Sequence, residues 1–454
     1  MTDYLEKIDG LLHKLFPICR SITGAGNRET LRILQEFVPL KILEYPSGSP
    51  VFDWLIPEEW EIHDGFIKNF RGELMVDFHQ NNLHVMNYSR AVQGEKSFEE
   101  LQPHLHYLQK LPDAIPYRTT YYNNDWGFCL THKQYKYLAE DGGPFKIFID
   151  TSFKKGSLTI GEVLIEGKSS EEVLISTYIC HPSMANDNLS GMILTAFLAK
   201  ELLSRKKLNR SYRIIFVPET IGAITYCAMN ESAMKTIDVG LVVTTVGGPG
   251  KFGYKQSFNE NHAINRLIEE TFREAGYDFT TYPFDIHGSD ERQYSSPGFR
   301  INTATICKDK YYEYSGYHNS LDNLDFVKPA YIQQSLQIYL KLIDKLEEQF
   351  NFFKTEIDCK KNEPDRREEY FISCHTNCEV MLSKHGLYPE VGGRSLPGKN
   401  NTSELDMILW LLFYCDGDRS ISDIAKKINI SSEELIRVAY ILEEKGIMKR
   451  INNG

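Results

Sequence analysis

Four continuous apolar runs that alternate with helical segments constrain the fold of this chain more than any other feature. The runs cover residues 173–179, 213–217, 239–246 and 301–307. Segments with helical periodicity cover residues 189–203, 263–275 and 329–350. A strand covered on both faces is typically an uninterrupted apolar run, and its alternation with helices is typical of a parallel sheet. The pattern predicts an α/β core with a mostly parallel sheet flanked by helices.

Polar side chains stand where these runs end. His181 follows the first run, and Asp187 lies six residues later in the segment Asp187-Asn-Leu-Ser-Gly191. Glu219 follows the second run, and His318 lies in the loop after the fourth. In open α/β sheets ligands bind at the carboxyl ends of the strands. Because imidazole and carboxylate groups suit zinc, the sequence favours a metal site at this edge.

Each of these residues also has an ordinary explanation. A single histidine beside a strand is usually a hydrogen-bonded surface or core residue. Glu219 could serve as the general base for a metal-activated water, or it could stabilise the N-terminus of a helix over residues 221–229. The coincidence of such residues at successive strand ends favours a shared site.

The same residues resemble, in type and order, the zinc aminopeptidase family of the bacterial leucyl aminopeptidase type. The matching positions are His181, Asp187 in its Asp-Asn-x-Ser-Gly segment, Glu219, Ser289-Asp290 and Tyr317-His318. The resemblance covers roughly residues 146–350. It implies that His181, Asp187 and His318 are metal ligands and that Glu219 is the catalytic general base.

The whole chain more closely resembles a bacterial group of aminopeptidase-like proteins that carry an inserted small domain and a winged-helix tail. The segments Arg20-Ser-Ile-Thr-Gly24, Pro46-Ser-Gly-Ser-Pro50 and Gly288-Ser-Asp-Glu-Arg-Gln-Tyr294 carry this likeness. Genes of this group are often associated with surface-polysaccharide or secondary-metabolite clusters. We expect a catalytic domain at residues 1–49 and 131–355, an inserted β-rich domain at 50–130, and a winged helix at 356–454.

The chain departs from the family at several ligand positions. Thr220 stands where the family has a second glutamate, and Thr244 or Thr245 replaces an aspartate ligand after the third run. A two-zinc site needs ligands for each ion, and two of them are missing here. His181, Asp187 and His318 remain as a set for one zinc ion with an open position. We therefore expect one zinc ion.

The resemblance implies hydrolysis of an amide bond in a small peptide or an aminoacyl conjugate. Asp290 and Tyr314 are candidates to hold the free amine of such a substrate. Arg292 could hold a carboxylate or a phosphate, although a structural ion pair is the alternative. A non-catalytic binding protein on a degenerate peptidase fold is the second hypothesis, because ligands are missing.

Charge argues against nucleic acid and anionic membranes as partners, since the formal net charge is −11. The expected recognition helix at residues 431–445 carries four glutamates against Arg437 and Lys445. Because phosphate binding needs cationic side chains, we expect no specific DNA binding.

The N-terminus has no signal-peptide pattern and no apolar run spans a bilayer, so the expected location is the cytoplasm. The sequence leaves open whether the protein forms a homo-oligomer.

One further segment contains metal-type residues. The nine cysteines are scattered, but Cys374 and Cys378 flank His375 in Cys-His-Thr-Asn-Cys. These residues could bind a metal ion. No second Cys/His pair follows at zinc-finger spacing, which favours ordinary reduced thiols.

Overall fold

An eight-stranded sheet forms the centre of the protein in the computed structural model, which describes residues 4–349, 368–387 and 403–451. Its strand order is β1 (Lys41–Pro46), β10 (Ser157–Ile165), β12 (Ser211–Val217), β11 (Glu172–Tyr178), β13 (Val239–Val243), β16 (Asn302–Lys308), β14 (Phe252–Lys255) and β15 (Phe279–Tyr282). The four strands β12, β11, β13 and β16 run parallel, while antiparallel pairings join β10 and β14 to them. The predicted mainly parallel α/β core is confirmed.

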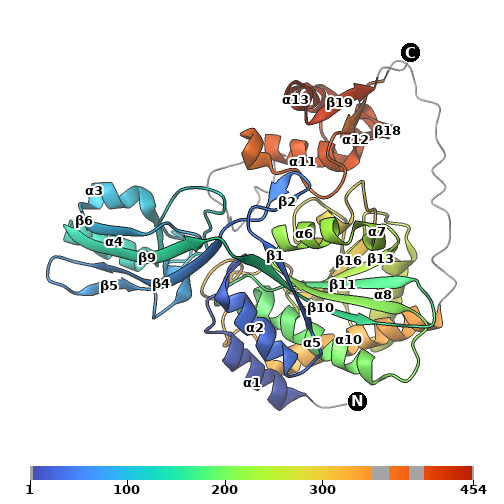
Figure 1. Ribbon diagram of the computed structural model, residues 1–454, viewed down its shortest axis with the longest axis horizontal. Coiled ribbons are helices and arrows are strands. Elements are labelled where there is room, and N and C mark those ends of the chain that lie inside the picture. Colours follow the sequence, from blue (N-terminus) through green and yellow to red (C-terminus); the bar gives the residue numbers. More distant parts are fainter. Residues whose placement is uncertain (1–3, 350–367, 388–402, 452–454) are drawn as a thin grey trace.

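Helices cover both faces of this sheet (Figure 1). One face packs against α1 (Leu5–Leu15), α2 (Ala25–Gln35), α5 (Gly191–Ser204), α8 (Ala263–Ala275) and α10 (Pro329–Glu348). The other packs against α6 (Ile221–Met229), α7 (Glu231–Met234) and α9 (Glu291–Tyr294). Strands β11 and β13 are therefore buried from both sides, which explains why they are apolar throughout.

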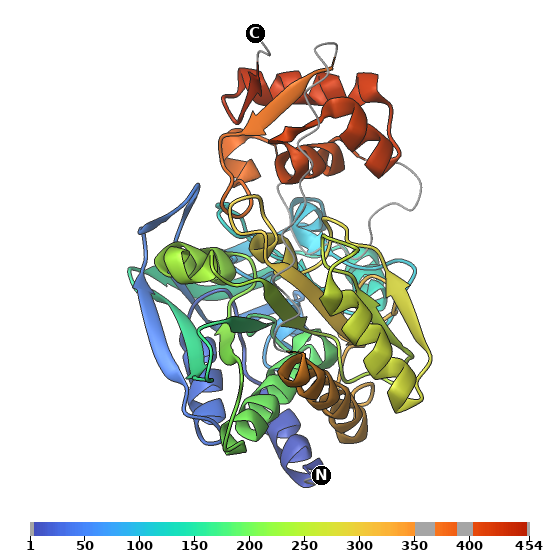
Figure 2. The ribbon, with the colours of Figure 1, turned by 90° about the vertical axis from the view of Figure 1, so that its right-hand side faces the viewer.

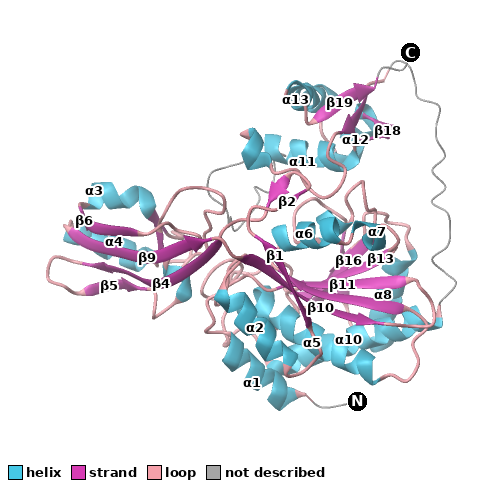
Figure 3. Cartoon of the chain, in the orientation of Figure 1, coloured by secondary structure: helices cyan, strands magenta, loops and turns pink. Residues whose placement is uncertain are grey.

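A smaller sheet extends from one end of the central sheet (Figure 3). Its strand order is β5 (Leu74–Asp77), β4 (Glu59–Lys68), β9 (Phe145–Lys154) and β6 (Val92–Lys96). Helices α3 (Phe98–Leu101) and α4 (His132–Asp141) and the short strands β7 (Leu105–His106) and β8 (Phe128–Cys129) accompany it. The range 50–130 for the inserted domain stays a prediction, and strand β9 lies beyond it.

The C-terminal part forms a winged helix above α6 and α7 (Figure 2). It contains α11 (Glu404–Tyr414), α12 (Ile421–Ile428) and α13 (Ser432–Glu444). Its sheet has the order β18 (Asp416–Ser420), β17 (Tyr370–Ser373) and β19 (Met448–Ile451). The predicted boundary between residues 355 and 356 lies outside the described residues. Within the described ranges, no helix is both long and apolar enough to cross a membrane.

Candidate metal centre

The structure brings His181, Asp187 and His318 together at the carboxyl edge of the central sheet. His181 follows β11, Asp187 lies in η3 (Ala185–Ser190) at the start of α5, and His318 lies in the loop after β16. One possible ligand atom from each lies within 4.8 Å of the others. Nε2 of His318 is 3.3 Å from Oδ2 of Asp187. Two imidazoles and a carboxylate at this spacing can converge on one ion after small movements.

Burial sets the charge states of this cluster. It lowers the pKa of His181 to about 4, so this imidazole is neutral at neutral pH and can act as a ligand. Burial also acts to raise the pKa of Asp187, but the neighbouring His181 and His318 outweigh it and hold that pKa below its ordinary value. Asp187 is therefore an ionised carboxylate with only 1% of its surface exposed.

One oxygen of Asp187 is available to a cation. Oδ1 accepts a hydrogen bond from the hydroxyl of Tyr178, which also contacts Oγ1 of Thr244 at 2.6 Å. Oδ2 is buried and has no well-aligned hydrogen-bond partner among the described residues. A buried, ionised oxygen without such a partner is costly unless a cation binds it. The donor set of His181, Asp187 and His318 thus fits a zinc ion.

The segment that follows Asp187 is fixed to two strands. The side-chain amide of Asn188 donates to Oγ1 of Thr177 at 2.9 Å and to the carbonyl oxygen of Tyr178 at 3.1 Å. At Gly191 a Cβ atom would lie 2.5 Å from the carbonyl oxygen of Val243, so only glycine allows this approach. These contacts explain why Asp187-Asn-Leu-Ser-Gly191 needs its asparagine and its glycine.

Asp322 holds the backbone at Asp187 in place, a role that the sequence analysis did not predict. Its carboxylate accepts the backbone N–H of Asn186 at 2.6 Å and that of Asp187 at 2.9 Å. It also accepts the hydroxyl of Tyr314 at 3.0 Å. Burial raises the pKa of Asp322 to about 7. The hydroxyl of Tyr314 thus contacts Asp322, and a substrate contact for Tyr314 stays a prediction.

Glu219 stands beside the cluster at the end of β12. Its Oε2 lies 3.7 Å from Nε2 of His181, and a quarter of its side chain is exposed. Burial, together with the negative charges of Asp290 and Asp187, raises the pKa of Glu219 well above its ordinary value. Glu219 is thus a carboxyl group with a raised affinity for a proton, next to the proposed ligands.

Asp290 and Arg292 lie close enough to Glu219 for their charges to shift its pKa. Oδ1 of Asp290 accepts the backbone N–H of Thr220 at 2.7 Å, and burial raises the pKa of Asp290 to about 7. Nε of Arg292 lies 3.0 Å from Oε2 of Glu379, which is the structural ion pair that the sequence left open. A substrate role for Asp290 and Arg292 stays a prediction.

Three residues at this edge have a strained backbone conformation. Thr220, Thr245 and His318 have φ angles of 62°, 50° and 54°, in the left-handed region that bulky residues rarely adopt. Such conformations cluster at functional sites, where the surrounding structure enforces them. Thr220 stands at one of the departing ligand positions, and Thr245 is one of the two threonines that could stand at the other.

A segment before β8 lies over the two histidines. The backbone N–H of Tyr117 donates to the carbonyl oxygen of His318 at 2.8 Å. The ring of Tyr117 lies 5.1 Å from that of His181 and 5.4 Å from that of His318. This cover leaves only 13% of the His318 side chain exposed. No feature of the sequence distinguishes Tyr117 from the other tyrosines.

Comparisons with known proteins agree with this architecture. A family model described as "Domain of unknown function (DUF4910)" matches residues 10–349, and a winged helix-turn-helix model matches residues 371–450. A Clostridium acetobutylicum protein, provisionally named for polysaccharide biosynthesis with an aminopeptidase-like domain, is 39% identical over 434 residues. This alignment covers 96% of the present chain and 93% of that protein.

Two solved structures show the same fold. A crystal structure from Clostridium acetobutylicum, provisionally called a peptidase, has a TM-score of 0.73 and 37% identity over 98% of this chain and 96% of that one. A zinc aminopeptidase from Bacillus subtilis has a TM-score of 0.55 and 11% identity over 76% of this chain and 95% of that one. The chain therefore belongs to the DUF4910 family and combines an aminopeptidase-like fold with a C-terminal winged helix.

Proposed function

We propose that the protein is a zinc-dependent amide hydrolase in which His181, Asp187 and His318 hold one zinc ion. The observation that carries this proposal is the buried Oδ2 of Asp187, which has no well-aligned hydrogen-bond partner among the described residues and lies close to both histidines. The carboxyl group of Glu219, whose pKa is raised, lies beside His181. When bound, zinc would supply a Lewis acid that polarises the scissile carbonyl and acidifies a water molecule.

Glu219 would move the proton in this reaction. As general base its carboxylate accepts a proton from the attacking water, and as general acid it then donates that proton to the leaving amine. The position of Glu219, 3.7 Å from His181, supports this role. Burial and the charge of Asp290 raise the pKa of Glu219, which makes its carboxylate a stronger base.

The surroundings favour a small substrate with a free amine. Oδ2 of Asp290 is buried and has no hydrogen-bond partner in the described part of the chain, so it is available to an ammonium group. Tyr117 covers the histidines and restricts the size of the group that can enter. The relative named for polysaccharide biosynthesis supports an aminoacyl conjugate from such a pathway as the substrate class.

Zinc-loaded protein incubated with a panel of dipeptides and aminoacyl amides tests this proposal. We expect release of a free amino acid that requires zinc and stops when Glu219 is replaced by Gln. If zinc-loaded protein cleaves no amide in the panel, while the Asp187 cluster binds zinc, the proposal is wrong and a non-catalytic binding function takes its place.

A further inference from the structure

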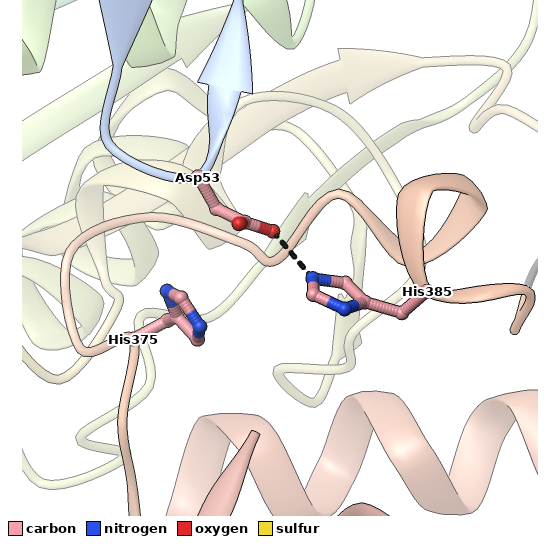
Figure 4. A group of neighbouring side chains, drawn as sticks. All are labelled: Asp53, His375 and His385. Carbon is pink, nitrogen blue, oxygen red and sulfur yellow. Dashed lines mark hydrogen bonds and ion pairs between the residues drawn. The ribbon is translucent and has the colours of Figure 1, made fainter. Parts of the chain in front are cut away.

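A second group of metal-type side chains lies outside the candidate metal centre, where the winged helix meets the central domain. The structure separates the two cysteines of the Cys374–Cys378 segment: Cys374 is exposed, and Cys378 is buried. His375 instead lies beside His385 and Asp53 (Figure 4). One possible ligand atom from each of these three lies within 4.8 Å of the others.

Asp53 comes from a part of the chain far from the two histidines. It stands at the turn between β2 (Pro50–Val51) and β3 (Trp54–Leu55), and only 4% of its side chain is exposed. Oδ2 of Asp53 lies 3.0 Å from Nε2 of His385 and accepts the backbone N–H of Met381 at 2.9 Å. Oδ1 accepts Nζ of Lys384 at 2.7 Å. Both oxygens of this buried carboxylate are thus directed at the C-terminal part.

His375 completes the group from the opposite side. Figure 4 shows its ring and that of His385 facing Asp53 from two different segments. The ring centroids of the two histidines are 6.3 Å apart. Its imidazole makes no hydrogen bond within the described residues, whereas that of His385 is held by Asp53. One ring is therefore held in place and the other is free to bind a ligand.

We propose that Asp53, His375 and His385 bind one zinc-class divalent cation. Two imidazoles and a carboxylate form a donor set that suits zinc, and the fourth position would be open to water. Coordination through Oδ2 leaves Oδ1 with Lys384, in the manner of the outer hydrogen bonds that orient metal-binding carboxylates. This proposal does not depend on the proposed hydrolase activity.

An ion at this place would fix a loop that reaches the candidate active site. The loop that carries His375 also carries Glu379, whose carboxylate pairs with Arg292 and whose backbone N–H donates to Oε1 of Gln293 at 3.0 Å. Arg292 and Gln293 lie in α9, directly after Asp290. Because its ligands come from two parts of the chain, metal binding would stabilise the docking of the winged helix and the position of Arg292.

Zinc titration of metal-free, full-length protein by calorimetry tests the proposal. The background variant His181→Ala/His318→Ala removes the other candidate centre, so that among the described residues this group of possible ligands remains. We expect it to bind one equivalent of zinc and to unfold at a higher temperature with zinc than without. In that background, His375→Ala or His385→Ala should weaken zinc binding by more than about 100-fold, beyond the loss that outer-shell changes cause.

Two controls separate a metal site from a simple ion-pair contact. Lys384→Met removes the hydrogen bond to Oδ1 of Asp53 and should weaken zinc binding by at most about 10–100-fold, less than the loss of either histidine. His79→Ala removes a histidine 3.3 Å from Asp64 on the smaller sheet and should leave the zinc affinity unchanged. Zinc binding that is absent from the background variant overturns the proposal. So does binding that persists at full affinity in folded His375→Ala and His385→Ala proteins.

Discussion

Oδ2 of Asp187 lies 3.3 Å from Nε2 of His318, although the two residues follow different strands of the central sheet. The parallel arrangement of β11, β13 and β16 brings their loops to one edge. Tyr178 and Asp322 then fix Asp187 so that one oxygen faces the histidines. The proposed ion would bind at this edge of the sheet, next to the oxygen of Asp187 that Tyr178 and Asp322 help to position.

Replacing His318 by Ala should remove zinc from this centre. Loss of one of three protein ligands should lower its affinity by more than the roughly 10–100-fold that outer-shell substitutions cost. Metal analysis after dialysis against a weak chelator measures this. His79→Ala is the matched control, and an unchanged zinc content in the His318 variant would count against the assignment.

Glu219→Gln should abolish hydrolysis while zinc stays bound. Glutamine keeps the shape of the side chain but cannot accept a proton from water, and general-base catalysis typically contributes about 10²–10⁴-fold. Rates on a cleaved amide, measured together with zinc content, check this. Loss of zinc in the variant would show instead that Glu219 is a ligand, and near-normal rates would assign the base to another group.

Asp290→Asn should stabilise the protein at neutral and higher pH. Burial raises the pKa of Asp290 to about 7 in the folded state, above the value of about 3.9 expected when unfolded. A raised folded pKa gives stability that is present below the unfolded pKa and is lost as pH rises through the folded one. Asparagine avoids this loss and can still accept the N–H of Thr220.

Thermal unfolding of Asp290→Asn and wild type at pH 4, 6 and 8 provides the measurement. The advantage of the variant should be near zero at pH 4 and reach about 1–4 kcal/mol at pH 8, since one unit of pKa difference corresponds to about 1.4 kcal/mol. A variant that is less stable than wild type at pH 8 contradicts this account.

Glu59→Gln should have the opposite pH dependence. Burial acts to raise the pKa of Glu59, but Arg28, whose Nη1 lies 3.0 Å from Oε2, outweighs it and lowers that pKa. A depressed folded pKa gives stability that is present above the unfolded value of about 4.3 and is lost as pH falls through the folded value. The variant should lose roughly 1–3 kcal/mol at pH 7. Denaturant unfolding should show this deficit shrinking below pH 4, and a constant deficit would refute the ionic explanation.

The winged helix should not bind DNA specifically. Arg437, the arginine of α13, donates to Glu404 at 3.0 Å, and the same helix carries four glutamates. Specific DNA-binding proteins typically reach about 10⁻⁸ M or tighter. Gel shifts with a pool of random duplexes at physiological salt should detect no selected sequence at that concentration.

The sequence predicted the elements with strong periodicity well. Helix α8 has the expected bounds, and the four apolar runs match β11, β12, β13 and β16 within a few residues. Strands β14 and β15 were missed because they are four residues long and stand among polar residues. Strand β17 was missed for the same reason. A short strand forms because it pairs with neighbouring strands, and the local sequence pattern does not reveal those neighbours.

The residues of the candidate site also differ in how far the sequence predicts their positions. His181 and Glu219 stand within three residues of a strand end, and Asp187 lies in the connection from β11 to α5, so their place at one edge follows from topology. Tyr117 and Asp322 act through contacts that depend on tertiary packing, so their roles could not be predicted from the sequence. The ion pair of Arg292 with Glu379 also required the docked position of the C-terminal part.

The most direct test of the central claim is an anomalous difference map recorded at the zinc edge from zinc-soaked crystals of the wild-type protein. We predict one peak at the carboxyl edge of the central sheet, bonded to nitrogen atoms of His181 and His318 and to an oxygen of Asp187 at about 2.0–2.2 Å. Absence of a peak there, or ligand atoms of the three side chains more than about 5 Å apart, would contradict the claim because one ion could not bind all three.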